Sequence, residues 1–190
     1  MIPSHVLLAA YRTGIFPMGN REGGLDWYSP LRRGIIPLDR VHVPKRLARL
    51  MHRNRFTVRI DEAFEDVVAS CAAQEDSWIT PEIIESYVEL FRLGYAHSVE
   101  TWEGKRLVGG LYGVSLRGAF FGESMFNKVT DASKVALVAL ADRLQARGYT
   151  LLDTQWLTEH LARFGAIEIT REDYMRRLEE SLTHNCHFVD

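Results

Sequence analysis

The chain has 190 residues, and its 23 Lys and Arg against 25 Asp and Glu give a formal net charge of −2 with neutral His. Hydrophobic residues make up 46% and charged residues 25%, which excludes disordered, collagen-like and coiled-coil chains. The longest uninterrupted apolar run, 135–141, is far below the roughly 18 residues that span a bilayer, and residues 1–13 lack the pattern of a signal peptide. Cys71 and Cys186 form no CxxC pair, so neither a disulfide framework nor a cysteine zinc site is expected. These features predict a cytoplasmic protein without a membrane partner.

The first 55 residues predict a small N-terminal domain. Ser4 is expected to cap a short helix that continues to Tyr11 and stops at Gly14. Residues 14–34 carry several Gly and Pro breakers and are expected to form loops. The segment 40–55 follows, with six Lys and Arg and no acidic residue.

Residues 56–92 predict a strand and two helices. The strand at 56–60 alternates in polarity, and Asp61 is expected to cap the helix that follows. Thr80 with Pro81 predicts the start of the second helix, because Pro is favoured at the first helical position. The apolar spacing of this helix predicts a buried stripe made of Ile84, Tyr87, Val88 and Phe91.

The remainder of the chain predicts a sheet flanked by helices. Three strand-like runs at 97–102, 106–114 and 119–126 are separated by short turns and predict an antiparallel meander. Asp131 is expected to cap a long helix. The elements expected after it are a helix at 132–147, strands at 149–155 and 166–169, a short helix at 159–163 and a Thr170-capped helix to 182. The overall pattern predicts an α+β domain over 56–190 joined to the small domain over 1–55.

Several catalytic signatures are absent from the sequence. It contains neither the GxxxxGK[ST] motif of a P-loop nor a GxGxxG dinucleotide fingerprint. It also lacks HExxH and GxSxG, and its seven His have no metal-ligand spacing. An enzyme built on this chain is therefore expected to act on an already activated substrate, without a metal or a cofactor.

Two polar constellations stand in apolar strands. Glu123 lies within the run 120–126, where a buried carboxylate is costly unless it has a partner. It is interpreted either as a member of a structural ion pair or as a carboxylate that faces a ligand. Asp153 and Gln155 share one face of the predicted strand 149–155. They are interpreted either as a pair that holds a nucleophile and a reacting carbonyl or as caps of the next helix.

Two further features suggest nucleic-acid binding. Lys45, Arg49 and Arg53 are spaced i, i+4, i+8, which places them on one face of a predicted helix. This face is either a phosphate-contacting patch or an ordinary solvated surface. The early aromatic residues either stack on the bases of a single-stranded end or pack the small domain against the main one. They are Tyr11, Phe16, Trp27, Tyr28 and Trp78.

Read together, these motifs resemble the leucyl/phenylalanyl-tRNA–protein transferase family. The most specific match is GESMF at 122–126 following LVGGLYGV at 107–114. The other matching segments are 10–17, 27–30, 77–80, 96–100, 132–134, 152–155 and 164–166. The resemblance therefore covers nearly the whole chain.

The resemblance implies a main domain like that of the acetyl-CoA-dependent N-acetyltransferases (GNAT), with a small N-terminal domain. It implies an enzyme that takes Leu or Phe, and Met less readily, from aminoacyl-tRNA. The acceptor is the α-amino group of a protein that begins with Arg or Lys, and the product is marked for degradation. An aminoacyl ester is already activated, which agrees with the absence of cofactor motifs.

The resemblance also suggests roles for individual residues. Asp153 and Gln155 correspond to a catalytic pair, in which Gln155 orients the amine or the ester while Asp153 accepts a proton or polarises Gln155. Glu123 corresponds to a carboxylate that holds the aminoacyl α-amino group or supports that pair. The implied amino-acid pocket consists of Tyr87, Leu111, Phe120, Gly122, Ser124, Leu137, Leu140 and Leu152. The implied tRNA-binding residues are Lys45, Arg49, Arg53, Trp78 and Tyr11.

This sequence departs from the family pattern in places, and two other functions compete. Met18 stands where some members have a Trp that contacts the terminal adenosine, and Thr158 replaces an amide-bearing residue. One alternative is an acetyl-CoA-dependent N-acetyltransferase, although 127–131, before the long helix, has no Gly for a pyrophosphate loop. The other is a non-catalytic tRNA-binding module, which would bind charged and uncharged tRNA alike.

Overall fold

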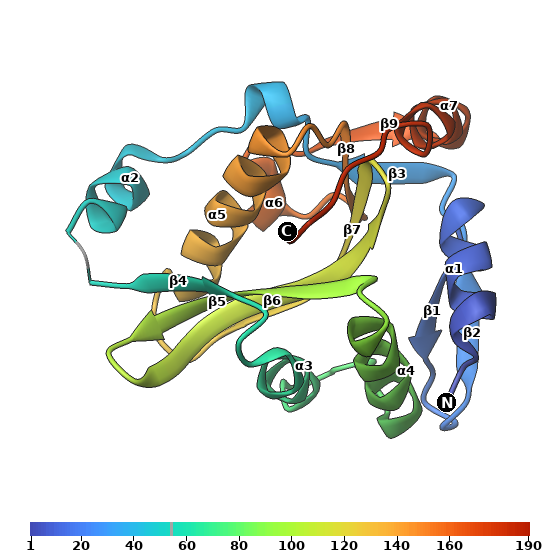
Figure 1. Cartoon of the computed structure of the whole chain (residues 1–190), viewed down its shortest axis with the longest axis horizontal. Helices are drawn as coiled ribbons and strands as arrows, with labels where there is room; N and C mark the ends of the chain where they lie inside the picture. The colour runs from blue at the N-terminus through green and yellow to red at the C-terminus, as the bar shows by residue number, and fades with distance from the viewer. Residues whose placement is uncertain (54) are drawn as a thin grey trace.

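The computed structural model describes residues 1–53 and 55–190, which form a layered α+β structure (Figure 1). The strands are β1 (Phe16–Gly19), β2 (Leu25–Tyr28), β3 (Arg32–Ile35), β4 (Thr57–Ile60), β5 (Ala96–Glu103), β6 (Arg106–Leu116), β7 (Ala119–Asn127), β8 (Leu151–Gln155) and β9 (Ile167–Thr170). The helices are α1 (Ser4–Arg12), α2 (Lys45–Met51), α3 (Phe64–Ala72), α4 (Pro81–Arg92), α5 (Ala132–Ala146), α6 (Glu159–Ala162) and α7 (Arg171–Ser181), with a 3₁₀ turn η1 (Leu38–Arg40).

A seven-stranded mixed sheet forms the centre of the molecule, in the order β4-β5-β6-β7-β8-β3-β9. Strands β4 to β7 pair antiparallel, which confirms the predicted meander, whereas β8 pairs parallel with β7. Helix α5 covers one face of the sheet, and α3 and α4 cover the other (Figure 1). Strands β1 and β2 form a separate hairpin beside α1.

Strand β3 lies in a region that was predicted to be loop. Its residues pair antiparallel with both β8 and β9, so a segment near the N-terminus completes the main sheet. The sequence of β3, RRGI, lacks polar alternation, and the strand is held by partners more than 100 residues away in the chain. The hairpin β1–β2 was missed in the same loop prediction. A domain boundary at residue 55 remains a proposal. Within residues 1–55, strand β3 belongs to the main sheet.

Three predicted helix caps are wrong. Pro3, not Ser4, is the N-cap of α1. Asp61 lies two residues before Ala63, the N-cap of α3, and its carboxylate accepts hydrogen bonds from strand β5. Asp131 does occupy the N-cap of α5, but its side chain pairs with Lys134 and does not bond the helix backbone. For Asp61 and Asp131, a tertiary or neighbouring partner takes the side chain that would otherwise cap the helix.

Two other caps are confirmed. The Thr80 hydroxyl accepts from the Ile83 backbone N–H at 3.3 Å, with Pro81 as the first residue of α4. The Thr170 hydroxyl accepts from the Asp173 backbone N–H at 3.2 Å at the start of α7. Local hydrogen bonds of this kind depend on residues only three apart, which is why the sequence predicts them.

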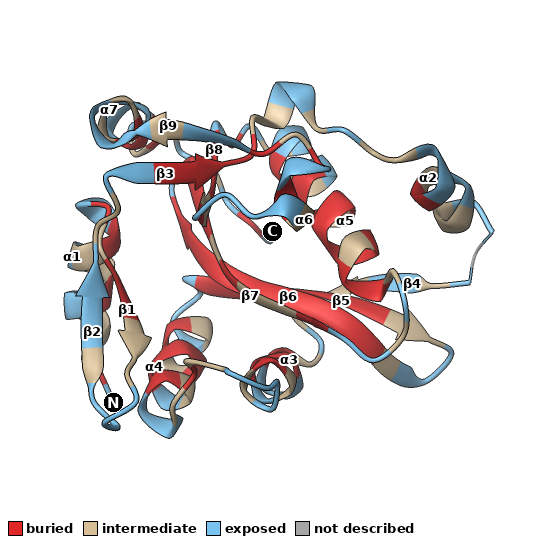
Figure 2. Ribbon diagram, turned by 180° about the vertical axis from the view of Figure 1, so that it is seen from behind, coloured by how far each residue is buried: buried red, intermediate tan, exposed pale blue. Residues whose placement is uncertain are grey.

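The buried side chains form two apolar clusters, one on each face of the sheet. Figure 2 shows that the buried residues are concentrated along the central strands β5, β6 and β7 and in the helices packed on them. The buried stripe of α4 is shifted from its prediction, because Ile83 and Leu90 are fully buried while Ile84 and Phe91 are half-buried. Tyr87 and Val88 are buried as expected. Among the described residues, no helix is long and apolar enough to cross a bilayer.

Candidate active site

An apolar hollow opens where β7 and β8 separate. The two strands pair only from Ala119 with Leu151 to Phe121 with Asp153, and beyond this point they diverge. The hollow has a volume of about 250 Å³ and is bounded by β6, β7, α5, β8 and α6. Its lining consists of Leu111, Tyr112, Gly122, Glu123, Ser124, Met125, Leu137, Leu140, Leu152, Thr154, Thr158, His160 and Leu161. Six of the eight residues expected in the amino-acid pocket are among them.

The other two expected pocket residues, Phe120 and Tyr87, lie elsewhere. Phe120 is fully buried and stacks on Phe188, with 5.2 Å between ring centroids. Tyr87 is fully buried on the opposite face of the sheet, beside Tyr11. Both therefore support the walls around the hollow, while Met125, Thr158, His160 and Leu161 line it without having been predicted.

Glu123 owes its position to a β-bulge in β7. On β6, Tyr112 pairs with Ser124 and the next residue, Gly113, pairs with Gly122. Glu123 is thus the extra residue, and a bulge of this kind bends the strand and redirects its side chains. The GES sequence at 122–124 places Gly122, Glu123 and Ser124 at this bulge. In a regular strand, the side chains on one side of this point would face the opposite side of the sheet.

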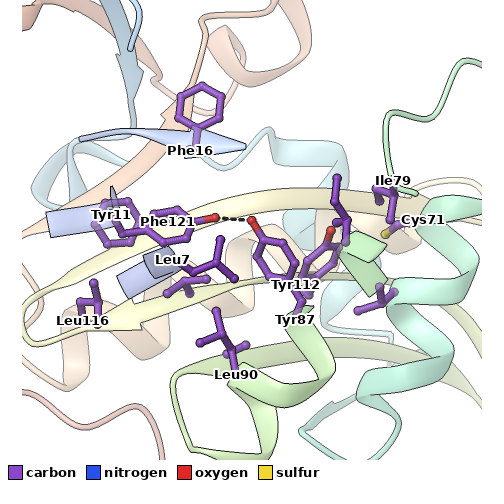
Figure 3. Packing of buried hydrophobic residues seen from close by; sticks show 14 of the residues in the cluster. Leu7, Tyr11, Phe16, Cys71, Ile79, Tyr87, Leu90, Tyr112, Leu116 and Phe121 are labelled. Carbon is purple, nitrogen blue, oxygen red and sulfur yellow. Dashed lines mark hydrogen bonds between the residues drawn. The ribbon is translucent and has the colours of Figure 1, made fainter. Parts of the chain in front are cut away.

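The Glu123 carboxylate is held by two tyrosines and an amide. The Tyr11 hydroxyl donates to Oε1 at 2.6 Å, and the Tyr87 hydroxyl donates to Oε2 at 3.3 Å. The Gln155 side-chain amide lies 3.4 Å from Oε2. The hydroxyls of Tyr11 and Tyr87 also point toward each other (Figure 3). Because each hydroxyl has one hydrogen and that of Tyr11 goes to Oε1, the hydrogen of Tyr87 is shared between the Tyr11 oxygen and Oε2. The arrangement supplies hydrogen bonds to Glu123 but no cation.

The surroundings of Glu123 change its acidity. Only 8% of the residue is exposed, and the pKa of its carboxyl is raised to about 7, chiefly by desolvation. The nearby Asp153 charge also raises this pKa, whereas the hydrogen bonds from Tyr11, Tyr87 and Gln155 lower it. The pKas of the Tyr11 and Tyr87 hydroxyls are raised well above their ordinary value by burial, and next by the Glu123 charge. Glu123 is therefore the group in this network that can change charge near neutral pH.

Asp153 has a different environment, in which a buried arginine neutralises it. Arg33 of β3 donates to the carboxylate through Nε at 3.0 Å and through Nη2 at 2.6 Å. The Tyr174 hydroxyl of α7 donates to Oδ2 at 2.7 Å, and the Gln155 backbone N–H donates to Oδ1 at 2.8 Å. Burial acts to lower the pKa of Arg33, but the adjacent Asp153 charge raises it above its ordinary value.

Gln155 connects the two carboxylates. Its backbone N–H is bound to Asp153, and its side-chain amide faces Glu123. Its φ of 66° places it in the left-handed region, which is uncommon for a residue other than Gly. Leu152 and Thr154 of β8 line the hollow, whereas Asp153 and Gln155 of the same strand do not. Gln155 is linked to the hollow through the contact of its side-chain amide with Glu123.

A second hollow, of about 290 Å³, carries most of the predicted basic patch. It is lined by Arg46, Arg49, Leu50, Arg53, Arg55, Thr130 and Asp131. Helix α2 ends at Met51, so the prediction that Arg53 continues its helical face is wrong. Lys45 and Arg49 lie on α2 and are exposed. Arg46 is drawn toward Asp131 at 3.6 Å and Arg55 pairs with Glu103 at 2.9 Å.

The predicted stacking residues separate into two groups. Trp78 is half-buried and lines a hollow of about 600 Å³ with Gly19, Asn20, Tyr28 and neighbouring residues. Tyr11 is only 1% exposed, so the expectation that it presents a free ring for stacking is wrong. Its position on α1 places the ring in the core and its hydroxyl on Glu123. Phe16 is likewise buried, and packs edge-on against Trp156 at 5.2 Å.

Comparison with known proteins identifies the family. Residues 35–179 match the family described as leucyl/phenylalanyl-tRNA protein transferase, and residues 3–31 match the N-terminal domain of that family. The chain belongs to the leucyl/phenylalanyl-tRNA protein transferase family. This confirms the resemblance expected from the sequence motifs.

Curated relatives in this family cover almost the whole chain. A leucyl/phenylalanyl-tRNA–protein transferase of Phenylobacterium zucineum is 55% identical over 188 residues, covering 96% of this chain and 85% of the relative. One from Caulobacter vibrioides is 55% identical over 182 residues, covering 93% and 84%. One from Gloeobacter violaceus is 50% identical over 184 residues, covering 96% and 95%.

Solved structures confirm the predicted fold class. The L-PGS structure from Bacillus licheniformis matches with a TM-score of 0.51 at 10% identity, covering 94% of this chain and 70% of that one. The GCN5-related glucosamine N-acetyltransferase region of a fungal GH3 β-N-acetylglucosaminidase matches with a TM-score of 0.52 at 15% identity, covering 78% and 21%. At these identities the likeness extends to the fold alone, which is an α+β, GNAT-like fold.

In this member of the transferase family, the sequence identified Glu123, Asp153 and Gln155 but not the residues that hold them. Arg33 and Tyr174 were missed because neither belongs to a recognisable motif. Arg33 lies in a segment rich in Gly, Pro and Arg, and Tyr174 is a single Tyr on the polar helix α7. Tyr11 and Tyr87 were named, but for other roles. Across the described residues there is no cluster of three or more His, Cys, Asp or Glu that could hold a metal ion.

Proposed function

We propose that this protein transfers Leu or Phe, and Met less readily, from aminoacyl-tRNA to the α-amino group of proteins that begin with Arg or Lys. The product would carry a new N-terminal residue that marks it for degradation. The observation that carries the proposal is the apolar hollow lined by Glu123, whose carboxylate is contacted by the Gln155 amide, in a chain of the leucyl/phenylalanyl-tRNA protein transferase family.

The hollow suits a large aliphatic side chain that is not branched at the β-carbon, or an aromatic one. Its volume is about 250 Å³, and six of its thirteen lining residues are Leu or Met. Apolar burial of a Leu or Phe side chain contributes roughly 1.5–3 kcal/mol to binding. Discrimination against Ile and Val depends on shape near the β-carbon, where one methyl group is worth about 1–3 kcal/mol.

The reaction requires positioning more than activation. The acceptor α-amino nitrogen attacks the ester carbonyl carbon, an amide C–N bond forms, and the C–O bond to the ribose breaks. One amine proton ends on the ribose oxygen that leaves, so no further reactant is consumed. An α-amine has an ordinary pKa of about 8, so a useful fraction is neutral near pH 7. Holding amine and ester together therefore supplies much of the rate increase.

The polar residues at the edge of the hollow divide this work. The Gln155 amide nitrogen faces Glu123, which leaves its carbonyl oxygen to accept a hydrogen bond from the incoming amine. Glu123, when ionised, supplies the negative charge that an aminoacyl ammonium group needs. Both oxygens of Asp153 already accept hydrogen bonds from Arg33 and from Tyr174 or Gln155, so Asp153 supports Gln155 and does not take the proton.

Binding of tRNA is assigned to the exposed cations and to the Trp78 hollow. Lys45, Arg49 and Arg53 are exposed around the basic hollow and suit the phosphates of an acceptor stem. Trp78 and Tyr28 offer rings for a terminal base. Contacts of this type make binding salt-dependent. Each phosphate contact steepens the fall of the binding constant with increasing salt concentration.

An acetyl-CoA-dependent transferase is supported less well. Such an enzyme binds a pyrophosphate at a helix N-terminus, where backbone N–H groups and the helix dipole favour an anion. The long helix α5 here begins at Asp131, whose own carboxylate is 12% exposed and pairs with Lys134. A fixed negative charge at this position opposes a second anion.

The experiment incubates the protein with Leu-, Phe-, Met- and Ile-tRNA, each carrying a labelled amino acid, and peptides that begin with Arg or Lys. Label should reach both peptides from Leu- and Phe-tRNA, less from Met-tRNA and least from Ile-tRNA. A matched peptide with an acetylated N-terminus should receive none. No transfer, together with equal binding of charged and uncharged tRNA, would instead indicate a tRNA-binding module, and heat released on adding acetyl-CoA would indicate the acetyltransferase.

A further inference from the structure

Gln155 is held in a backbone conformation that its own chemistry disfavours. The φ of Gln155 is 66°, and such left-handed values are unfavourable for a non-Gly residue because Cβ approaches the following carbonyl oxygen. The turn continues directly, since the Trp156 backbone N–H donates to the Thr154 carbonyl at 2.7 Å. Such a residue persists only where its surroundings over-determine it, and residues of this kind cluster at functional sites.

The Asp153 carboxylate is the group that holds this turn. Its Oδ1 accepts the Gln155 backbone N–H at 2.8 Å, so the carboxylate reaches over the turn and ties it down. A free carboxylate could rotate away from this bond. Here rotation is blocked, because Arg33 bonds both oxygens and the Tyr174 hydroxyl bonds Oδ2.

Arg33 is itself fixed on every side. It is 1% exposed, its Nη1 donates to the Gly14 carbonyl at 2.8 Å, and its guanidinium lies 4.7 Å from the Phe16 ring centroid and 4.3 Å from that of Tyr174. The planar fork of Arg can satisfy a carboxylate, a carbonyl and two rings at once, which a Lys ammonium cannot do. The assembly therefore joins the turn after α1, β1, β3 and α7 to the one carboxylate beside Gln155.

Gly34 brings this assembly against the turn. It pairs with Gln155 across β3 and β8, and a Cβ added to it would lie 2.4 Å from the Trp156 carbonyl carbon. Only Gly allows β3 to pass this close to residues 155–157. The strand that carries Arg33 thus also contacts the turn directly.

We propose that Arg33 and Tyr174 are positioning residues for aminoacyl transfer, which lock the Asp153 carboxylate so that it fixes the left-handed backbone of Gln155 and aims its carboxamide. The inference rests on the proposed function. A buried ion pair is by itself a weak source of net stability, because desolvation offsets much of its attraction. Its placement beside a strained site residue gives it a second role.

The test uses the full chain with Tyr174→Phe, which removes one hydrogen bond to Asp153 and keeps the ring over Arg33. We expect kcat for transfer of Leu from Leu-tRNA to a peptide beginning with Arg to fall about 10-fold, with KM for Leu-tRNA within about twofold. Arg33→Lys keeps the charge but not the fork, and should lower kcat further.

A matched control is Tyr149→Phe, which also removes a buried hydroxyl, in this case one bonded to Ser115 at 2.6 Å. We expect its kcat to stay within about twofold of wild type. The dependence on Gln155 is tested in a Gln155→Ala background, where adding Tyr174→Phe should change the residual rate by less than about twofold, because a positioning residue has nothing left to position.

Hydrogen exchange of the Gln155 backbone amide provides a readout that needs no activity. Tyr174→Phe should accelerate this exchange at least 10-fold, and Tyr149→Phe should leave it unchanged. Unchanged exchange and unchanged kcat in Tyr174→Phe would overturn the inference, as would a 10-fold loss that persists in the Gln155→Ala background. A wild-type protein that transfers no Leu would overturn the proposed function alone, since the exchange result still decides whether the clamp exists.

Discussion

The two carboxylates beside the hollow are buried on neighbouring strands but are treated in opposite ways. Asp153 is fully buried and is bound to a guanidinium, a phenol and a backbone N–H. Glu123 is 8% exposed and is bound by two phenols and a weak amide contact, with no cation. One carboxylate is therefore ion-paired within the scaffold, and the other, with a pKa raised to about 7, can change its protonation near neutral pH.

This difference shows how one fold separates support from chemistry. A carboxylate that is fully paired holds neighbouring groups still, but it has no free lone pair for a substrate. A carboxylate that has only neutral donors keeps a raised pKa and responds to an incoming cation. We therefore assign Asp153 to positioning Gln155 and Glu123 to binding the substrate, and four experiments test this difference.

The largest effect is expected from Arg33→Met, which leaves Asp153 buried without its cation. We expect the free energy of unfolding to fall by about 3–5 kcal/mol, measured by urea denaturation. Arg33→Met combined with Asp153→Leu should recover at least half of this loss, because the uncompensated charge is gone. A loss below about 1 kcal/mol in the single variant would show that Asp153 does not depend on Arg33 to compensate a buried charge.

A slightly smaller effect is expected from the pH dependence of Glu123. Its pKa of about 7 in the folded chain exceeds the ordinary value of 4.5, so the folded state binds more protons between these two pH values. The contribution of this group to stability is therefore full below pH 4.5 and is lost as the pH rises to 7, by about 3 kcal/mol. The difference in unfolding free energy between wild type and Glu123→Gln should follow this slope, and a flat difference would contradict it.

Tyr11→Phe should shift the same titration. The Tyr11 hydroxyl donates to the charged form of Glu123, so its removal should raise the Glu123 pKa by about one unit, or roughly 1.4 kcal/mol. The pH profile of transfer would move to alkaline pH by that amount. Tyr149→Phe removes a hydroxyl that bonds Ser115 and not Glu123, so this variant should leave the pH profile unchanged.

The smallest effect concerns the backbone at Gln155. Gln155→Gly should be about 1 kcal/mol more stable than Gln155→Ala, because Gly adopts positive φ without the Cβ penalty. Both variants lose the carboxamide, so their difference isolates the backbone. Equal stability in thermal unfolding would show that the left-handed conformation is not maintained in solution.

The parts of the site that were predicted are those with local signals. The meander of β5 to β7 follows from alternating strands and short turns, and Leu111, Gly122 and Ser124 of the pocket lie on it. Leu137 and Leu140 were implied by the family resemblance, and both lie on α5. Strand β3 could not be predicted in the same way, since it is four residues long and its partners are in β8 and β9.

By itself, the sequence determined the family, the α+β class, the apolar walls and the three polar residues Glu123, Asp153 and Gln155. Only the tertiary structure decided which carboxylate is neutralised, because Arg33 lies 120 positions from Asp153 and Tyr11 lies 112 positions from Glu123. Periodicity and capping report on neighbours a few residues apart. The charge and the acidity of a buried group depend on whichever distant segments the sheet brings beside it.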